Sequence, residues 1–215
     1  MILYSKVTEV PESEPVTVAE AKTHLEVTGT AKDAYIGALI KAARRICEAD
    51  AGLSFVTQTR VIKLDRFPSC WPWPYRYGVH AMTNPYSEII LPYGPVLEIT
   101  SFTYVDTEGA DQTLTVDTDF YFDDHSAVAR LRPVSSWPST NIMPNAVTIE
   151  YTAGIDLDAD TSEEYLPIVK QAILLQVASF FENKQDEVPG SMTEINWNSK
   201  TLLDSIRVTW NANYD

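Results

Sequence analysis

The sequence has 215 residues, of which 45% are hydrophobic, and a formal net charge of −14 at pH 7. This hydrophobic content is enough for a packed core, so most of the chain is not expected to be disordered. Because negative charge is repelled by free nucleic acid, the composition argues against a sequence-reading DNA-binding domain. No run approaches the roughly 20 apolar residues that cross a bilayer, so we expect a soluble protein made in the cytoplasm, without membrane contact.

The first two predicted elements are helices. Thr17 and Glu20 have the spacing of a capping box and predict a helix over about 17–27. A second helix is predicted over about 33–51 and should end at Gly52. The charged residues 41, 44, 45 and 48 are expected to lie mostly away from its core face, which apolar residues mark at steps of three and four: Ile36, Leu39, Ile40, Ala43, Ile46 and Cys47.

A β-rich insertion is predicted over about 55–152. From Phe55 the hydrophobic period changes to two, and β-branched residues become common. Residues 106–109 predict a hairpin turn, because Gly109 tolerates the positive φ that a reversal needs. Further strands are predicted at 88–91, 99–105, 112–116, 120–122, 127–131 and 146–152.

The C-terminal part returns to helix. Pro167 is predicted to open a third main helix over about 167–183, since proline is tolerated in a first helical turn. The tail 185–215 is polar at first and then carries a short helix candidate over 200–208. The predicted fold class is therefore α+β: a mainly α-helical core of three main helices and a C-terminal helix, with an inserted antiparallel β region. Residues 1–184 would form one domain and 185–215 a tail.

The third helix is apolar nearly all the way round, whereas a surface helix keeps a polar half. Either it is central to its own core, or a neighbouring copy of the chain covers one face. The candidate contact residues are Ile168, Ile173, Leu174, Leu175, Val177, Phe180 and Phe181.

A segment rich in aromatic residues follows the first long strand. Its prolines cannot join a sheet ladder, so it is predicted to be a loop, and long loops are uncommon unless they bind something. Aromatic rings stack on sugars and anchor protein interfaces, but these could equally fold over the domain's own sheet. The candidate partner-contact residues are Trp71, Trp73, Tyr75 and Tyr77.

Catalytic patterns are hard to find in the sequence. It has no phosphate-binding loop, dinucleotide fingerprint, zinc-protease helix or serine elbow. His24, His80 and His125 are isolated from one another, and Cys47 and Cys70 have no metal-ligand spacing, so both are expected to be free thiols. We therefore expect neither an enzyme nor a bound cofactor or metal.

The order of these elements, together with several local strings, resembles the adaptor-type head–tail connector proteins of tailed phages. Each string is weak by itself, and the joint order and spacing carry the resemblance. The strings lie at residues 16–25, 33–43, 57–59, 136–138, 144–154, 167–175 and 182–184.

This resemblance implies a structural virion protein of the head–tail neck. Such proteins form a ring, commonly of twelve subunits, that docks beneath the portal and offers a platform to the next neck or tail protein. DNA would pass through the ring without specific binding, along a lumen that we expect to be neutral to acidic. The amphipathic end of the tail is the candidate portal contact, through Leu202, Leu203, Ile206 and Trp210. The alternative function is a carbohydrate- or receptor-binding module that uses the loop 71–77.

Overall fold

The structure is a computed structural model that describes residues 5–9, 11, 13–68, 88–125, 128–155, 162–183 and 197–207. It divides into two compact units. The sheet unit holds residues 1–10 and 58–153, and the helical unit holds residues 11–57 and 154–215. The chain therefore begins in the sheet unit, builds the first part of the helical unit, and returns to each of them once.

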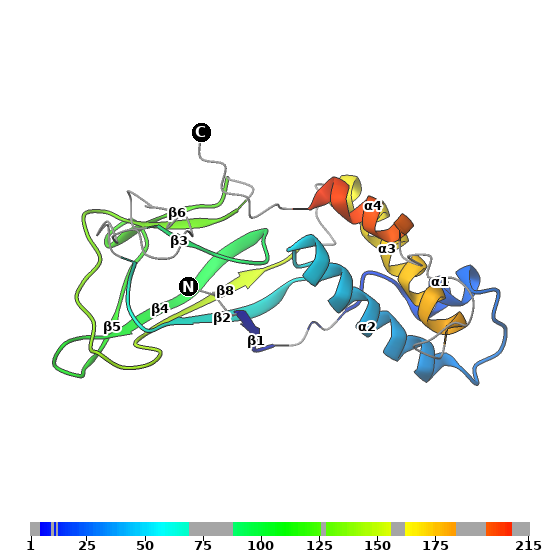
Figure 1. The fold of residues 1–215 in the computed structure, drawn as a ribbon, viewed down its shortest axis with the longest axis horizontal. Coiled ribbons are helices and arrows are strands. Elements are labelled where there is room, and N and C mark those ends of the chain that lie inside the picture. Colours follow the sequence, from blue (N-terminus) through cyan, green and yellow to red (C-terminus); the bar gives the residue numbers. More distant parts are fainter. Residues whose placement is uncertain are drawn as a thin grey trace, which may run out of the picture. The chain divides into compact units, whose positions relative to one another are not determined.

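The described part of the helical unit contains four helices: α1 Val18–His24, α2 Asp33–Ala51, α3 Ser162–Glu182 and α4 Trp197–Ile206 (Figure 1). α1 begins with the predicted capping box, in which the Thr17 hydroxyl accepts from the Glu20 N–H and the Glu20 carboxylate accepts from the Thr17 N–H. α2 ends at Gly52, whose φ of 70° is the left-handed conformation that glycine favours. α3 packs against α1, α2 and α4. The core of this unit is built from buried residues that include Ile36, Ile40, Phe55, Val169 and Ile173.

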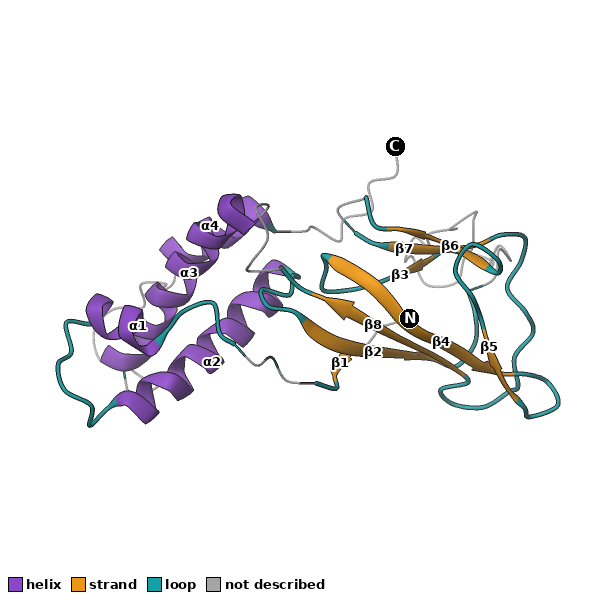
Figure 2. Cartoon of the chain, turned by 180° about the vertical axis from the view of Figure 1, so that it is seen from behind, coloured by secondary structure: helices purple, strands orange, loops and turns teal. Residues whose placement is uncertain are grey.

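The described part of the sheet unit contains eight strands in two antiparallel sheets (Figure 2). The larger sheet has the order β1-β2-β8-β4-β5 and the smaller one the order β3-β7-β6. β8 lies between β2 and β4, and its residues alternate between buried and half-buried positions, as expected for a strand with one face toward a core. The strands are β1 Ser5–Val7, β2 Gln58–Leu64, β3 Ile89–Ile90, β4 Val96–Val105, β5 Asp111–Thr113, β6 Phe120–Asp123, β7 Arg130–Pro133 and β8 Val147–Ala153.

Both sheets contribute to one core inside the sheet unit. Its centre is a group of aromatic rings in which Trp137 stacks on Phe67, with ring centroids 5.0 Å apart and planes 6° apart. Phe102 and Phe120 meet edge to face at 5.0 Å, and aromatic pairs favour such offset arrangements. This core is separate from the helical one, so each unit buries its own apolar surface.

The predicted fold class is therefore wrong in one respect: the chain is not a mainly helical core with a β insertion. The strands form two sheets that enclose a core of their own, because the alternating apolar residues of β2, β4 and β8 face those of the smaller sheet. β1, which was not predicted, pairs with β2 and adds residues from before the helices to the larger sheet.

The start of α3 is also corrected. Pro167 lies inside α3, which begins at Ser162, rather than opening it. Glu163 and Glu164 follow Ser162 in the sequence. Acidic residues favour the first turn of a helix because negative charge is stabilised by the positive end of the helix dipole. Among the described residues, no helix is both long and apolar enough to cross a membrane.

Candidate assembly surfaces

α3 carries the candidate subunit-contact residues, and most of them contact the chain's own core. Ile173 and Val177 are fully buried in the helical unit, and Leu174, Phe180 and Phe181 pack against its core. Ile168 and Leu175 are half-buried and lie outside that cluster. The Lys32 ammonium lies 4.7 Å from the ring centroid of Phe181, a cation–π distance. The first alternative from the sequence, a helix central to its own core, therefore accounts for five of the seven residues. A subunit contact through α3 stays a prediction.

α4 carries three of the four candidate portal-contact residues. Leu203 is buried in the helical core, and Leu202 and Ile206 are half-buried and pack against it. α4 contacts α2 and α3, and Arg207 at its end pairs with Asp50 of α2 at 3.2 Å. The apolar side of α4 is thus occupied within the chain. The portal contact stays a prediction, and Trp210 lies outside the described residues.

The aromatic residues Trp71, Trp73, Tyr75 and Tyr77 also lie outside the described residues. The carbohydrate- or receptor-binding alternative depends on this loop, so it stays a prediction as well.

A buried charge cluster lies on α2, where the sequence had predicted solvent-facing charges. Arg44 is only 3% exposed, and its guanidinium donates to Glu14 at 2.6 Å and to Glu48 at 2.9 Å. The other oxygen of the Glu48 carboxylate accepts from the Phe55 N–H at 2.9 Å. The cluster therefore fastens the segments on both sides of α2 to the helix. The i,i+4 spacing of Arg44 and Glu48 was the available sequence signal, since this spacing favours ion pairs on one helix face.

Ile46 is the corresponding error on the apolar side of α2. It was predicted to face the core, but it is 49% exposed. The core stripe of α2 instead runs through Ile36, Ile40, Ala43 and Cys47. Burial raises the pKa of the Cys47 thiol to about 12, so this cysteine is unreactive at neutral pH.

The start of α1 is fastened to α3 by charge. The Glu20 carboxylate accepts from the Lys170 ammonium at 2.7 Å and also closes the capping box with Thr17. The bond from Lys170 and the Thr17 N–H lower the pKa of Glu20 from 4.5 to about 2. Glu20 is therefore ionised at any pH where the protein is expected to work.

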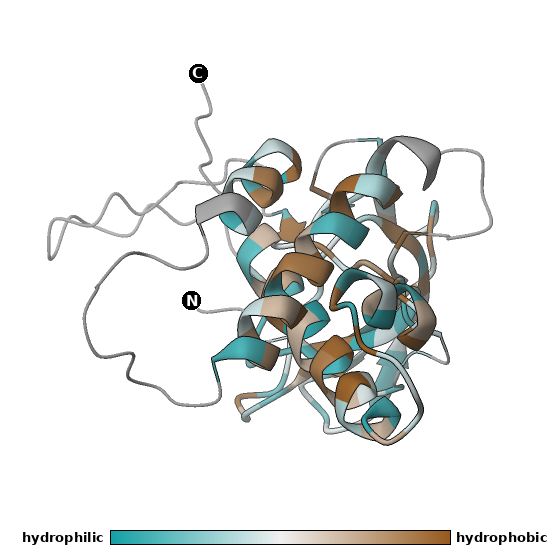
Figure 3. Cartoon of the chain, turned by 90° about the vertical axis from the view of Figure 1, so that its right-hand side faces the viewer, coloured by the Kyte–Doolittle hydropathy of each residue, from teal (hydrophilic) through white to brown (hydrophobic). Residues whose placement is uncertain are grey.

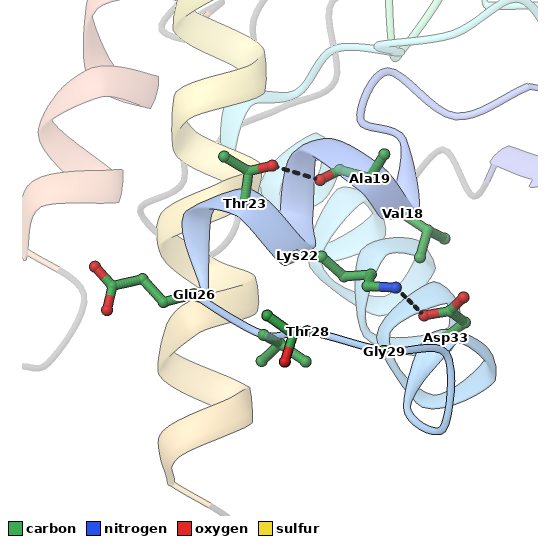
Figure 4. Close-up of a pocket in the computed structure, with 9 residues that line it drawn as sticks. Val18, Ala19, Lys22, Thr23, Glu26, Thr28, Gly29 and Asp33 are labelled. Atoms are coloured by element: carbon green, nitrogen blue, oxygen red, sulfur yellow. Dashed lines mark hydrogen bonds and ion pairs between the residues drawn. The ribbon is translucent and has the colours of Figure 1, made fainter.

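A shallow depression lies beside α1 and the loop that leads to α2 (Figure 4). Lys22 and Asp33 form an ion pair at 2.8 Å on its wall, and the Thr23 hydroxyl bonds to the Ala19 carbonyl. The side chains of Lys22, Asp33 and Thr23 therefore bind groups of the chain itself. The remaining lining residues are Val18, Glu26, Val27, Thr28 and Gly29.

The two histidines that the structure describes belong to different units, His24 to the helical unit and His125 to the sheet unit. His24 is exposed on α1, and His125 is exposed beside Asp124, whose carboxylate raises the pKa of His125 through a 2.7 Å hydrogen bond. His80 is outside the described residues. Within the described ranges, no group of three His, Cys, Asp or Glu side chains could hold a metal ion.

Known proteins resemble this chain in structure. No family model and no curated protein sequence matches the chain. One match is a solved chain from the neck of an empty gene transfer agent (GTA) particle, computed with C6 symmetry. Its TM-score is 0.65 at 19% identity, and the match covers 96% of each chain. A chain from the neck of the native GTA particle, computed with C12 symmetry, matches with a TM-score of 0.65 at 18% identity, over 97% of this chain and 96% of that one.

A third match comes from the virion of the native gene transfer agent (GTA) particle. It has a TM-score of 0.65 at 18% identity and covers 95% of both chains. The likeness thus includes both units and nearly the whole length of each chain. The sequence resemblance to head–tail connector proteins is confirmed at the level of the fold, which is that of chains from the neck of a phage-like particle.

Proposed function

We propose that this chain is a structural subunit of the neck of a phage-like particle, and that its activity is assembly rather than catalysis. The observation that carries the proposal is the end-to-end match with chains from GTA necks, at 96% coverage in both directions. A match over both units is more specific than one helical bundle or one sheet, since each of those recurs in unrelated proteins.

The subunits would form a ring of the adaptor type. The two neck structures with similar chains were computed with C6 and C12 symmetry, which supports copies arranged around an axis. Twelve subunits is the number that the family resemblance implies. DNA would pass through the central hole without specific binding, because a chain with a net charge of −14 offers little attraction to a polyanion.

The ring would meet the portal on one side and the next neck or tail protein on the other. For the portal side we keep the C-terminal segment as the candidate, with Leu202 and Ile206 as its half-buried apolar residues and Trp210 beyond them. Because Leu203 belongs to the helical core, this contact would have to form without removing α4 from that core.

Electron microscopy of the chain mixed with portal rings from its own particle tests the proposal. We expect a ring of added density on one end of the portal, and an averaged map that fits both units in every copy. A chain that leaves the portal rings unchanged at high concentration, and is absent from purified particles, would contradict a neck role.

A further inference from the structure

The outward face of α2 has an unusual composition for a surface helix. Eight of its 19 residues are exposed; six of these are apolar, two are basic and none is acidic. Outward faces of surface helices normally carry mostly polar and charged residues, and in Figure 3 apolar stretches are visible along the helices. We call the eight exposed residues the α2 face: Ala34, Tyr35, Ala38, Lys41, Ala42, Arg45, Ile46 and Ala49.

The α2 face has the properties of a contact surface. Tyr35 is 43% exposed and Ile46 49% exposed, while the alanines between them would let another chain approach closely. Lys41 and Arg45 are exposed, and neither forms an ion pair with another described residue. In a chain with a net charge of −14, this face would attract a surface that is both apolar and acidic.

The sheet unit has such a surface at one end. Ile142 is fully exposed and Met143 is 42% exposed, next to each other in the segment between β7 and β8. Hydrogen bonds hold this segment on both sides of the pair: the Asn141 N–H donates to the Val105 carbonyl at 3.0 Å, and the Asn145 N–H donates to Asp65 at 2.9 Å. Two apolar side chains are thus presented in a fixed position, which lowers the entropic cost of binding them.

The β4–β5 turn and the start of β5 carry acidic residues, and this turn lies next to Asn141, the residue before the pair. Asp106 accepts from the N–H groups of Glu108 and Ala110, each at 2.9 Å, and from the Gln112 side chain at 2.8 Å, so the turn has a defined shape. Glu108 and Asp111 are exposed. Lys63 and Arg66 are also exposed: Lys63 lies on β2, across β8 from β4, and Arg66 follows the exposed Asp65, which binds Asn145. We call Asp106, Glu108, Asp111, Ile142 and Met143 the acidic tip.

We propose that the acidic tip of one copy binds the α2 face of the next copy. This inference rests on the proposed function, since it names the contact that would join neighbours in the ring. The two surfaces match in kind, because each offers large exposed apolar side chains and they carry opposite charge. They are different surfaces, so the contact runs head to tail, and repetition of a head-to-tail contact closes a ring when the rotation permits.

Cysteine pairing tests whether the surfaces meet. With Cys70→Ser as the background, one chain carries Ile46→Cys and a second chain, with a size tag, carries Ile142→Cys. The two are mixed with portal rings under mild oxidation, and the disulfide-linked heterodimer is measured on a non-reducing gel. We expect it to exceed, by at least about tenfold, the yield from the matched control in which the exposed Leu97→Cys replaces Ile142→Cys. Equal yields from the two mixtures would overturn the inference.

Charge reversal tests whether complementarity drives the contact. Lys41→Glu with Arg45→Glu is expected to reduce ring formation on portal rings at least about tenfold at low salt, and so is Glu108→Lys with Asp111→Lys. The chain with all four changes is expected to recover assembly. Lys6→Glu with Lys63→Glu, which changes the net charge by the same amount at exposed positions outside both surfaces, should assemble like the wild type.

The outcomes separate this inference from the proposed function. If wild-type rings form on the portal and the Lys41→Glu, Arg45→Glu chain forms them equally well, the inference is overturned and the neck role stands. If that chain no longer binds the portal, and the Ile46→Cys and Ile142→Cys chains give no more disulfide than the Leu97→Cys control, the α2 face meets the portal instead and the inference is again overturned. If the wild type forms no ring with the portal, both fail together.

Discussion

The two long helices of the helical unit, α2 and α3, expose apolar surface in the reverse order to what their sequences suggest. α3 is apolar nearly all round, which suggested surplus surface for a partner, yet most of its large side chains pack within the chain. α2 looked amphipathic in the usual way, yet its outward face is mostly apolar and its buried side holds Arg44 and Glu48. The hydropathy of a helix therefore indicates how much apolar surface is to be buried, but the positions of neighbouring helices decide which side of the helix is buried.

The exposed apolar surface lies on α2 rather than on α3. α3 is central because α1, α2 and α4 all contact it, so three helices share the burial of its side chains. α2 has helices on one side only among the described residues, which leaves Tyr35 and Ile46 exposed. A partner is therefore to be sought on α2 before α3.

Arg44→Met should have the largest effect, because it removes the guanidinium that binds both Glu14 and Glu48. Glu48 would remain buried beside Glu14 after losing the guanidinium, and breaking a buried ion pair in this way costs about 3–5 kcal/mol. The free energy of unfolding, measured with urea, gives the loss. Arg45→Met is the matched control on the exposed side and should stay within about 0.5 kcal/mol of the wild type. Similar losses in the two variants would mean that Arg44 is not buried as described.

A pair of isoleucine variants tests the difference between the helices directly. Ile173→Ala in α3 should lower the free energy of unfolding by about 2–5 kcal/mol, because it leaves a cavity in the core. Ile46→Ala in α2 should change it by no more than about 0.5 kcal/mol, since the side chain is already half in solvent. Denaturant unfolding of both proteins under one set of conditions gives the comparison. If Ile46→Ala is as costly as Ile173→Ala, the assignment of the outward face of α2 is wrong.

Leu203→Ala tests whether α4 covers α3, because it removes a buried side chain of α4. Leu203 is a residue of α4 that is buried in the helical core. Its truncation should lower the free energy of unfolding by about 2 kcal/mol, the lower end for leucine in a core, because α4 is short. Thermal unfolding followed by circular dichroism measures the shift. Lys200→Ala, exposed on the same helix, is the control. A neutral Leu203→Ala would contradict the burial of this side chain and leave the apolar side of α4 free for a portal contact.

Glu20→Gln should have the smallest effect, about 1 kcal/mol, because the capping box and the pair with Lys170 are partly exposed to solvent. The folded pKa of Glu20 is about 2, below its ordinary value of 4.5, so the carboxylate stabilises the fold above pH 4.5. That contribution is lost as the pH falls from about 4.5 to about 2. Unfolding free energies across this range should therefore fall less steeply in Glu20→Gln than in the wild type. Parallel curves would contradict the low pKa.

Sequence reasoning was most successful where neighbours along the chain make the structure. The bounds of α2 at Asp33 and Ala51, the Thr17 capping box and the reversal at Gly109 all follow from interactions within a few residues. Seven of the eight described strands of the sheet unit were also located, because period-two alternation is a local signal. Its failures were of another kind: β1 is too short to stand out alone and exists because β2 pairs with it.

The existence of the helices, the caps at Thr17 and Gly52, most strands, the acidic charge and the resemblance to connector proteins could be read from the sequence. It is in the folded chain that the strands are seen to enclose a second core, that Arg44 is buried and Ile46 exposed, and that α4 packs its apolar side within the chain. The difference is one of range: a turn or a cap is fixed by bonds between residues a few positions apart, whereas burial depends on segments such as 44–55, 162–183 and 197–206 meeting in space.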